Sequence, residues 1–178
     1  MNGTAVSLTV NQTAQSIGLT GKVSGDGSTI SGDYSILSSG CGATETGTWT
    51  AEKIKTLSGT LTGEFTSGVV GVVPFEFTGT VTQGANTGAT FATLAGSMTS
   101  GNAVCLTDAT ISGNISGKSV VLNFLTSDGL AAGQLTGSAS ADATTVTGTY
   151  DFFNATKPLP GCPLGDFGSV TLTLQPQP

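Results

Sequence analysis

Residues 19–34 read LTGKVSGDGSTISGDY, and residues 135–150 read LTGSASADATTVTGTY. The first leucine and the final tyrosine match at one constant offset, since 135 − 19 = 116 and 150 − 34 = 116. Beyond the tyrosine, each copy continues to a cysteine and one further short run, where the offset becomes 162 − 41 = 121. The chain therefore contains an internal repeat, with a longer loop in its second copy.

Apolar or small residues alternate with polar ones in both copies. In the first copy Leu19, Gly21 and Val23 share one face, and polar residues lie between them. A period of two residues indicates β-strands with one buried face. Asp26-Gly27 between two such runs indicates a hairpin, since glycine adopts positive φ without penalty. Asp142-Ala143 stands at the same place in the second copy, and we expect it to turn differently or less tightly.

The inward faces of these runs contain glycines, which leave space over the strand. We expect these inward glycines to leave room for Tyr34 and Tyr150 from neighbouring strands, because aromatic side chains cover strand glycines in other sheets. In the last run of the repeat Trp49 takes the place of Val170.

Alternating runs continue along the whole chain, and none has useful helical periodicity. About a dozen runs at 8–12-residue spacing predict an all-β protein, either an antiparallel up-and-down barrel or a barrel-like sandwich of about 8–12 strands. About eight runs follow Leu57, which is enough for a closed barrel. We expect residues 1–178 to form one continuous antiparallel domain, with a partial module at 1–55, a complete module at 56–178 and the repeat boundary near 51–57.

Composition indicates an ordered, acidic protein. Only 9% of the 178 residues are charged, whereas 37% are apolar, the reverse of a disordered chain. The net charge of −6 argues against nucleic acid and anionic membrane surfaces as partners. The apolar runs are too short for a membrane span, which needs about 20 residues. There is no signal peptide, and we expect that a leader preceded Met1.

The three cysteines are Cys41, Cys105 and Cys162. Cys41 and Cys162 are repeat equivalents, and the counterpart of Cys105 in the first copy would fall before Met1. We therefore predict a Cys105–Cys162 disulfide, with Cys41 left single, which implies an oxidising compartment. Three free buried thiols and a Cys41–Cys105 pair are the alternatives.

The side chains offer little for catalysis. Without histidine there is no Ser-His-Asp or Cys-His arrangement and no histidine metal site. Most of the eleven acidic residues fall at turns or at outward strand positions, as surface carboxylates do. The loop at 24–28 suggests a calcium loop but lacks the several carboxylates of one. We predict no enzymatic activity, no metal and no cofactor.

Three aromatic residues are the candidate ligand-binding residues: Tyr34, Trp49 and Tyr150. They could line a pocket or form a platform for a sugar, and the alternative is that they are core aromatics. Threonines form outward rows, for example at 46, 48 and 50 and at 78, 80 and 82. Such rows could bind ice or carbohydrate, although threonine is also common in strands because it is β-branched.

The pattern LTGxxSxDxxTxxGxY, followed by GC and then TGTWT or GSVT, resembles Gly/Thr-rich β modules of uncharacterised bacterial secreted proteins and lipoproteins. The resemblance covers most of the chain and implies export to the cell envelope or the extracellular space. From the incomplete first module we expect a structural or adhesive role, with self-association by strand addition as a possible mode. A lipocalin-like or avidin-like barrel that binds a small apolar ligand is the alternative.

Overall fold

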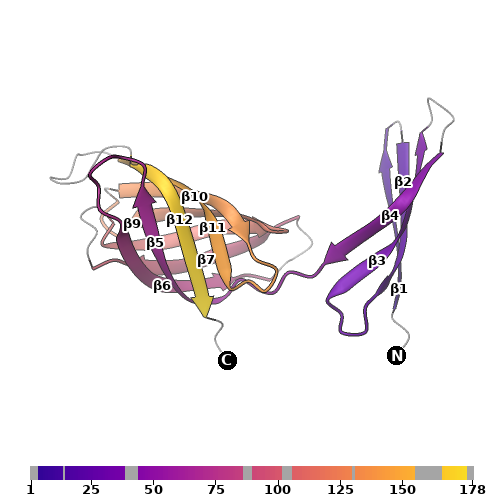
Figure 1. Ribbon diagram of the computed structural model, residues 1–178, viewed down its shortest axis with the longest axis horizontal. Coiled ribbons are helices and arrows are strands. Elements are labelled where there is room, and N and C mark those ends of the chain that lie inside the picture. Colours follow the sequence, from indigo (N-terminus) through magenta and orange to yellow (C-terminus); the bar gives the residue numbers. More distant parts are fainter. Residues whose placement is uncertain are drawn as a thin grey trace. The chain divides into compact units, whose positions relative to one another are not determined.

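The computed structural model describes residues 4–13, 15–38, 44–85, 90–101, 106–129, 131–154 and 166–175. Its regular structure consists of twelve β-strands (Figure 1). Within these ranges there is no helix, and hence none of the length and apolar character that crossing a membrane requires. The prediction of an all-β antiparallel fold with about a dozen strands is confirmed.

The first four strands form an open antiparallel sheet in the order β1-β2-β3-β4 (Figure 1). Their bounds are β1 Ala5–Gln12, β2 Gln15–Val23, β3 Thr29–Ser38 and β4 Thr44–Glu52. Among the described residues, β1 pairs with β2 alone and β4 with β3 alone. Both edges of this sheet therefore have a row of backbone groups that no neighbouring strand pairs.

The other eight strands close into an antiparallel barrel in which each strand pairs with its neighbours in sequence (Figure 1). They are β5 Gly59–Ser67, β6 Phe75–Gln83, β7 Ala92–Thr99, β8 Asp108–Ser116, β9 Ser119–Thr126, β10 Ala131–Ala139, β11 Thr145–Asn154 and β12 Phe167–Gln175. The closing pair is β12 with β5. Closure removes both sheet edges, as the sequence predicted for the region after Leu57.

The chain divides into two compact units, residues 1–53 and 54–178. The division lies within the repeat boundary expected near 51–57. The single continuous domain expected over residues 1–178 stays a prediction.

Side chains from all eight strands fill the interior of the barrel. Alternate positions point inward, so each strand contributes buried apolar residues, and Phe65 is fully enclosed. The Phe65 ring stacks on Phe77 at a centroid distance of 4.7 Å and meets the Tyr150 ring edge-on at 4.8 Å. Burial of this kind supplies most of the stability of a β-barrel.

The two copies of the repeat fold into equivalent four-stranded sheets. In the first sheet one cross-strand row runs Leu8, Leu19, Tyr34 and Gly47. In the barrel the equivalent row runs Leu122, Leu135, Tyr150 and Gly168. The strands β1 to β4 therefore correspond to β9 to β12, which are half of a closed barrel.

The hairpin turns of the two copies are also the same, contrary to the expectation that Asp142-Ala143 turns differently. Ala143 has a φ of 57° and Gly27 a φ of 72°. Both turns close with a backbone hydrogen bond, from Gly27 N to Ser24 O at 2.9 Å and from Ala143 N to Ser140 O at 3.0 Å. The aspartate determines the conformation of the turn more than the residue after it does, because its carboxylate accepts hydrogen bonds from both sides of the turn.

These two carboxylates have a lowered pKa. Ser24 and Ser28 donate hydroxyl hydrogen bonds to Asp26, and they hold its pKa at about 2, below the usual 3.8. Ser140 and the backbone and hydroxyl of Thr144 do the same for Asp142, with the pKa again at about 2. Hydrogen bonds to the charged form favour that form.

We predict that each turn stabilises its unit above pH 4 and that this contribution is lost as the pH falls through about 2. Asp142→Asn should lower the thermal midpoint of the barrel at pH 7, and the difference from the wild type should vanish near pH 2. Thermal melts followed by circular dichroism between pH 2 and 7 measure this. Asp151→Asn, at an exposed strand position, is the control, and an equal, pH-independent loss in both variants would contradict the assignment.

Candidate interaction surface

The open sheet exposes the face that its equivalent in the barrel buries. Leu8 is 54% exposed, whereas its counterpart Leu122 is 1% exposed. Val10, on the same face of β1, is exposed as well. All the buried apolar residues among the described ranges lie between Leu57 and Leu174. The first sheet therefore carries the inward pattern of a barrel without a second layer of its own residues to cover it.

An open hollow of about 500 Å³ lies on this sheet along the row described above. It crosses all four strands, and its apolar residues are Leu8, Leu19 and the ring of Tyr34. Asp33, Gly47 and several hydroxyl residues also line it. Such a surface has an apolar floor and a polar margin, as protein interfaces commonly do.

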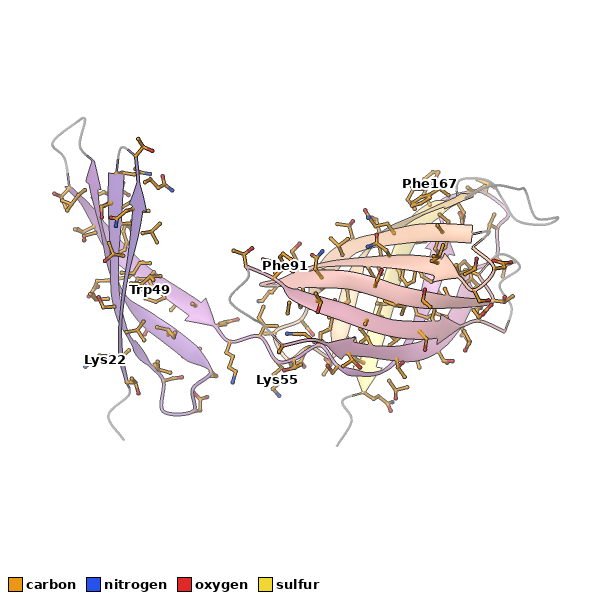
Figure 2. All side chains as sticks on the ribbon, turned by 180° about the vertical axis from the view of Figure 1, so that it is seen from behind. Lys22, Trp49, Lys55, Phe91 and Phe167 are labelled. Carbon is orange, nitrogen blue, oxygen red and sulfur yellow. The ribbon has the colours of Figure 1, made fainter. Side chains whose placement is uncertain are left out.

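Trp49, labelled in Figure 2, belongs to the neighbouring cross-strand row, which runs through Gly21, Gly32 and Trp49. Its indole Nε1 donates hydrogen bonds to the backbone carbonyls of Thr20, at 3.1 Å, and Asp33, at 3.2 Å. A Cβ on Gly21 would meet this indole at 3.1 Å, so the ring lies over that glycine. The indole reaches from β4 across β3 to β2, and it therefore points away from the β4 edge.

For Tyr34, the expectation that a tyrosine of the repeat lies over a glycine of a neighbouring strand is confirmed. The Tyr34 ring lies over Gly47 on the next strand, where a Cβ would come within 2.6 Å of it. A Cβ on Gly137 would meet the backbone of Thr147 at 2.5 Å. Aromatic cover of glycine does occur here, but the strand register decides which glycine each ring covers.

A tyrosine–carboxylate pair recurs in both units. The Tyr150 hydroxyl donates to Asp166 Oδ2 at 2.9 Å, and the Tyr34 hydroxyl donates to Glu45 Oε1 at 3.3 Å. Glu45 and Asp166 are repeat equivalents, because 166 − 45 = 121. This pair was not predicted from the sequence, although the offset of 121 that matches the cysteines also matches these two acids.

The two pairs differ in their surroundings. Asp166 is 4% exposed, and its other oxygen, Oδ1, accepts a hydrogen bond from the Ser67 hydroxyl on β5. Burial raises the pKa of Tyr150 well above its ordinary value of 10, and the adjacent Asp166 carboxylate raises it further. Glu45 is exposed and stands on β4, beyond which no strand is paired among the described residues.

The predicted site residues therefore fall into separate groups. Tyr34 and Trp49 lie on one apolar face, with the hollow along the row of Tyr34, whereas Tyr150 lies in the core of the barrel. Their binding role stays a prediction. Cys105 and Cys162, with Cys41, lie outside the described residues, so the disulfide also stays a prediction. The described part of the chain brings no three His, Cys, Asp or Glu side chains together as a metal site would require.

Neither a protein-family model nor a curated protein matches this chain. Among solved structures, intact Ap-TbpB with its N and C lobes is similar over 98% of this chain, at 13% identity and a TM-score of 0.28. The chain spans 38% of the length of that structure. A likeness at that TM-score carries no conclusion about function. The fold and the site define an all-β protein that combines a closed barrel with an open half-barrel sheet.

Two equivalent leucines test the difference in burial. Leu135→Ala should lower the free energy of unfolding of the barrel by roughly 2–5 kcal/mol, because it leaves a cavity in a closed core. Leu19→Ala should cost about 1 kcal/mol or less, because that side chain is only half buried. Urea denaturation by circular dichroism measures the barrel, and fluorescence of the single tryptophan, Trp49, measures the sheet. Equal losses would show that Leu19 is as enclosed as Leu135.

Tyr150 also makes the barrel sensitive to alkali. Its raised pKa contributes stability below pH 10, and this contribution is lost as the pH rises further, because the unfolded chain releases the proton more readily. Tyr150→Phe should cost about 1–3 kcal/mol at pH 7 by leaving the Asp166 oxygen without its donor. The variant should also lose stability less steeply above pH 10. Urea titrations at pH 7 to 11 test both effects, with Tyr34→Phe as the control; an unchanged slope would contradict them.

Proposed function

We propose that this protein is a non-enzymatic, exported structural or adhesive component of the cell surface or of an extracellular assembly. The open sheet of residues 4–53 is its contact surface. The observation that supports this proposal most strongly is the correspondence between β1–β4 and the half-barrel β9–β12. A sheet with the inward pattern of a barrel, two unpaired edges and an exposed apolar face favours a partner that adds strands.

The closed barrel favours a scaffold over a container for a small apolar ligand. Large side chains that are essentially inaccessible to solvent occupy its interior, among them Phe65, Phe124, Leu61 and Met98. A lipocalin-like site needs a cavity of at least about 300 Å³. The packed aromatic cluster around Phe65 occupies space that such a ligand would need.

The outer face of the barrel is rich in hydroxyls, which suits an exported surface with few charges. Thr78 lies beside Thr99 and Thr80 beside Ser97, with hydroxyl oxygens 3.4 Å apart in each pair. An ice lattice needs a flat array, whereas barrel strands twist and curve. A structural role therefore fits these rows better than ice or carbohydrate binding.

The test is fractionation of producing cells, followed by size-exclusion chromatography with light scattering. We expect the chain in the envelope or extracellular fraction, in particles larger than one copy. Leu8→Lys should release it as a monomer, because the charge falls on the exposed apolar face. Asn11→Lys, on the opposite face of the same strand and outside the lining of the hollow, is the matched control and should leave the particles intact.

Two checks complete this experiment. The far-ultraviolet circular dichroism spectrum should be unchanged in both variants, which shows that the sheet has folded. A wild-type chain that is monomeric in every fraction, or that remains inside the cell, would contradict the proposal.

A further inference from the structure

We propose that the open sheet β1–β4 is completed by a four-stranded antiparallel half-barrel of the β5–β8 type, which carries a hydroxyl side chain opposite Gly47. This inference rests on the proposed function, since it names the partner of the same contact surface. It commits to one kind of occupant, and a second copy of the open sheet is a competing outcome of the test.

All three strand pairings of the open sheet have the register of the barrel. Numbers in β1, β2, β3 and β4 convert to those in β9 to β12 by adding 114, 116, 116 and 121, as in 8 + 114 = 122 and 47 + 121 = 168. The same offsets turn Gly32↔Trp49 into Gly148↔Val170 and Gly21↔Gly32 into Gly137↔Gly148. A slip of one residue would turn every side chain to the opposite face, so a shared register means a shared inner face.

In the barrel, strands β5 to β8 cover the inner face of β9 to β12. Strand β12 pairs with β5, and β9 pairs with β8. The equivalent edges of the open sheet are β4 and β1. A unit of four strands with β5-like and β8-like edges therefore satisfies both edges and encloses the apolar face at once.

The stagger of the barrel also disfavours a second copy of the open sheet that pairs its β1 with β4 of the first. One cross-strand row passes through Ser67, Gly168, Tyr150, Leu135, Leu122, Gly113, Leu94 and Gln83. Extending the β5–β6 register two residues beyond Gly59↔Val81 brings the row back at Leu57, just before β5, and the Leu57 backbone N–H donates to the Gln83 side chain. The stagger is therefore 67 − 57 = 10 residues.

Two identical halves related by a two-fold axis along the barrel, with β4 of each copy beside β1 of the other, would each contribute half of this stagger, which is five residues. Five is an odd number, and an odd shift places the inward residues of one half beside the outward residues of the other. Two copies of β1–β4 arranged in this way therefore do not close with this stagger and keep both apolar faces inside. The β5–β8 type of half-barrel has no such conflict, because the barrel already contains it.

The tyrosine–carboxylate pair specifies one side chain of the partner. In the barrel, Ser67 lies opposite Gly168 and donates to Asp166, which also accepts from Tyr150. In the open sheet, Glu45 accepts from Tyr34 in the same way, and Gly47 takes the place of Gly168. The residue that arrives opposite Gly47 should therefore be a serine or threonine that donates to Glu45 and helps to satisfy a carboxylate that closure would bury.

The structure suggests a direct experiment, in which a second copy of residues 54–117 is spliced in front of Thr4 of the full chain. Thr4 is the equivalent of Lys118, because Val23 N donates to Thr4 O as Ala139 N donates to Lys118 O. The splice therefore recreates the β8–β9 hairpin. We expect a second barrel, with acrylamide quenching of Trp49 reduced at least threefold and the urea midpoint of its fluorescence raised.

Two variants confined to the added copy test the hydroxyl. Ser67→Ala should lower the urea midpoint of Trp49 fluorescence, whereas Thr66→Ala, which is exposed and faces outward in the barrel, should not. Equal effects of the two would overturn the assignment of the hydroxyl.

The remaining outcomes also decide the matter. An added segment that stays unfolded, with Trp49 quenching unchanged and the original barrel intact, overturns the proposed partner. The proposed partner is also overturned, in favour of a second copy, if light scattering shows the parent chain to be a dimer and its Trp49 fluorescence resists acrylamide quenching. Neither result bears on retention in the cell envelope, so failure of this inference and failure of the proposed function remain distinguishable.

Discussion

Strand register is the constraint on which the rest of this structure depends. Within each half of the repeat, a leucine on one strand stands beside a leucine, a tyrosine and a glycine on the next three. That register brings the tyrosine hydroxyl to a carboxylate in both copies, and in the first copy it leaves a glycine, Gly47, under the tyrosine ring. A displacement of one residue would break all of these contacts together, because strand faces alternate.

The consequences of this register depend on whether the second half of a barrel is present. Between β9 and β12 the row is enclosed, Tyr150 is 3% exposed and the carboxylate of Asp166 has two hydroxyl donors. Between β1 and β4 the same row lies open, with a hollow along it. The same local structure therefore serves as a core in one place and as a candidate contact surface in the other.

Much of the fold could be predicted from the sequence, because period-two alternation and Asp-Gly punctuation are strong local signals. The repeat offsets indicated that Tyr34 and Tyr150 hold equivalent places. The Ser67–Asp166 contact could not be predicted in this way, since it joins residues 99 apart and depends on barrel closure. The geometry at Ala143 was also missed, because the aspartate before it, and not the glycine of the first copy, determines the turn.

Hydrogen exchange of the purified chain, measured as a monomer without a partner, tests the central claim most directly, namely that β1–β4 is a half-barrel with free edges. The backbone amides of β12 that face β5 should exchange slowly, at rates set by opening of the barrel. The equivalent amides at the outer edge of β4 should exchange at least a hundredfold faster, while the amides between β3 and β4 stay protected. Equal protection at the outer edges of β4 and β12 would contradict the account.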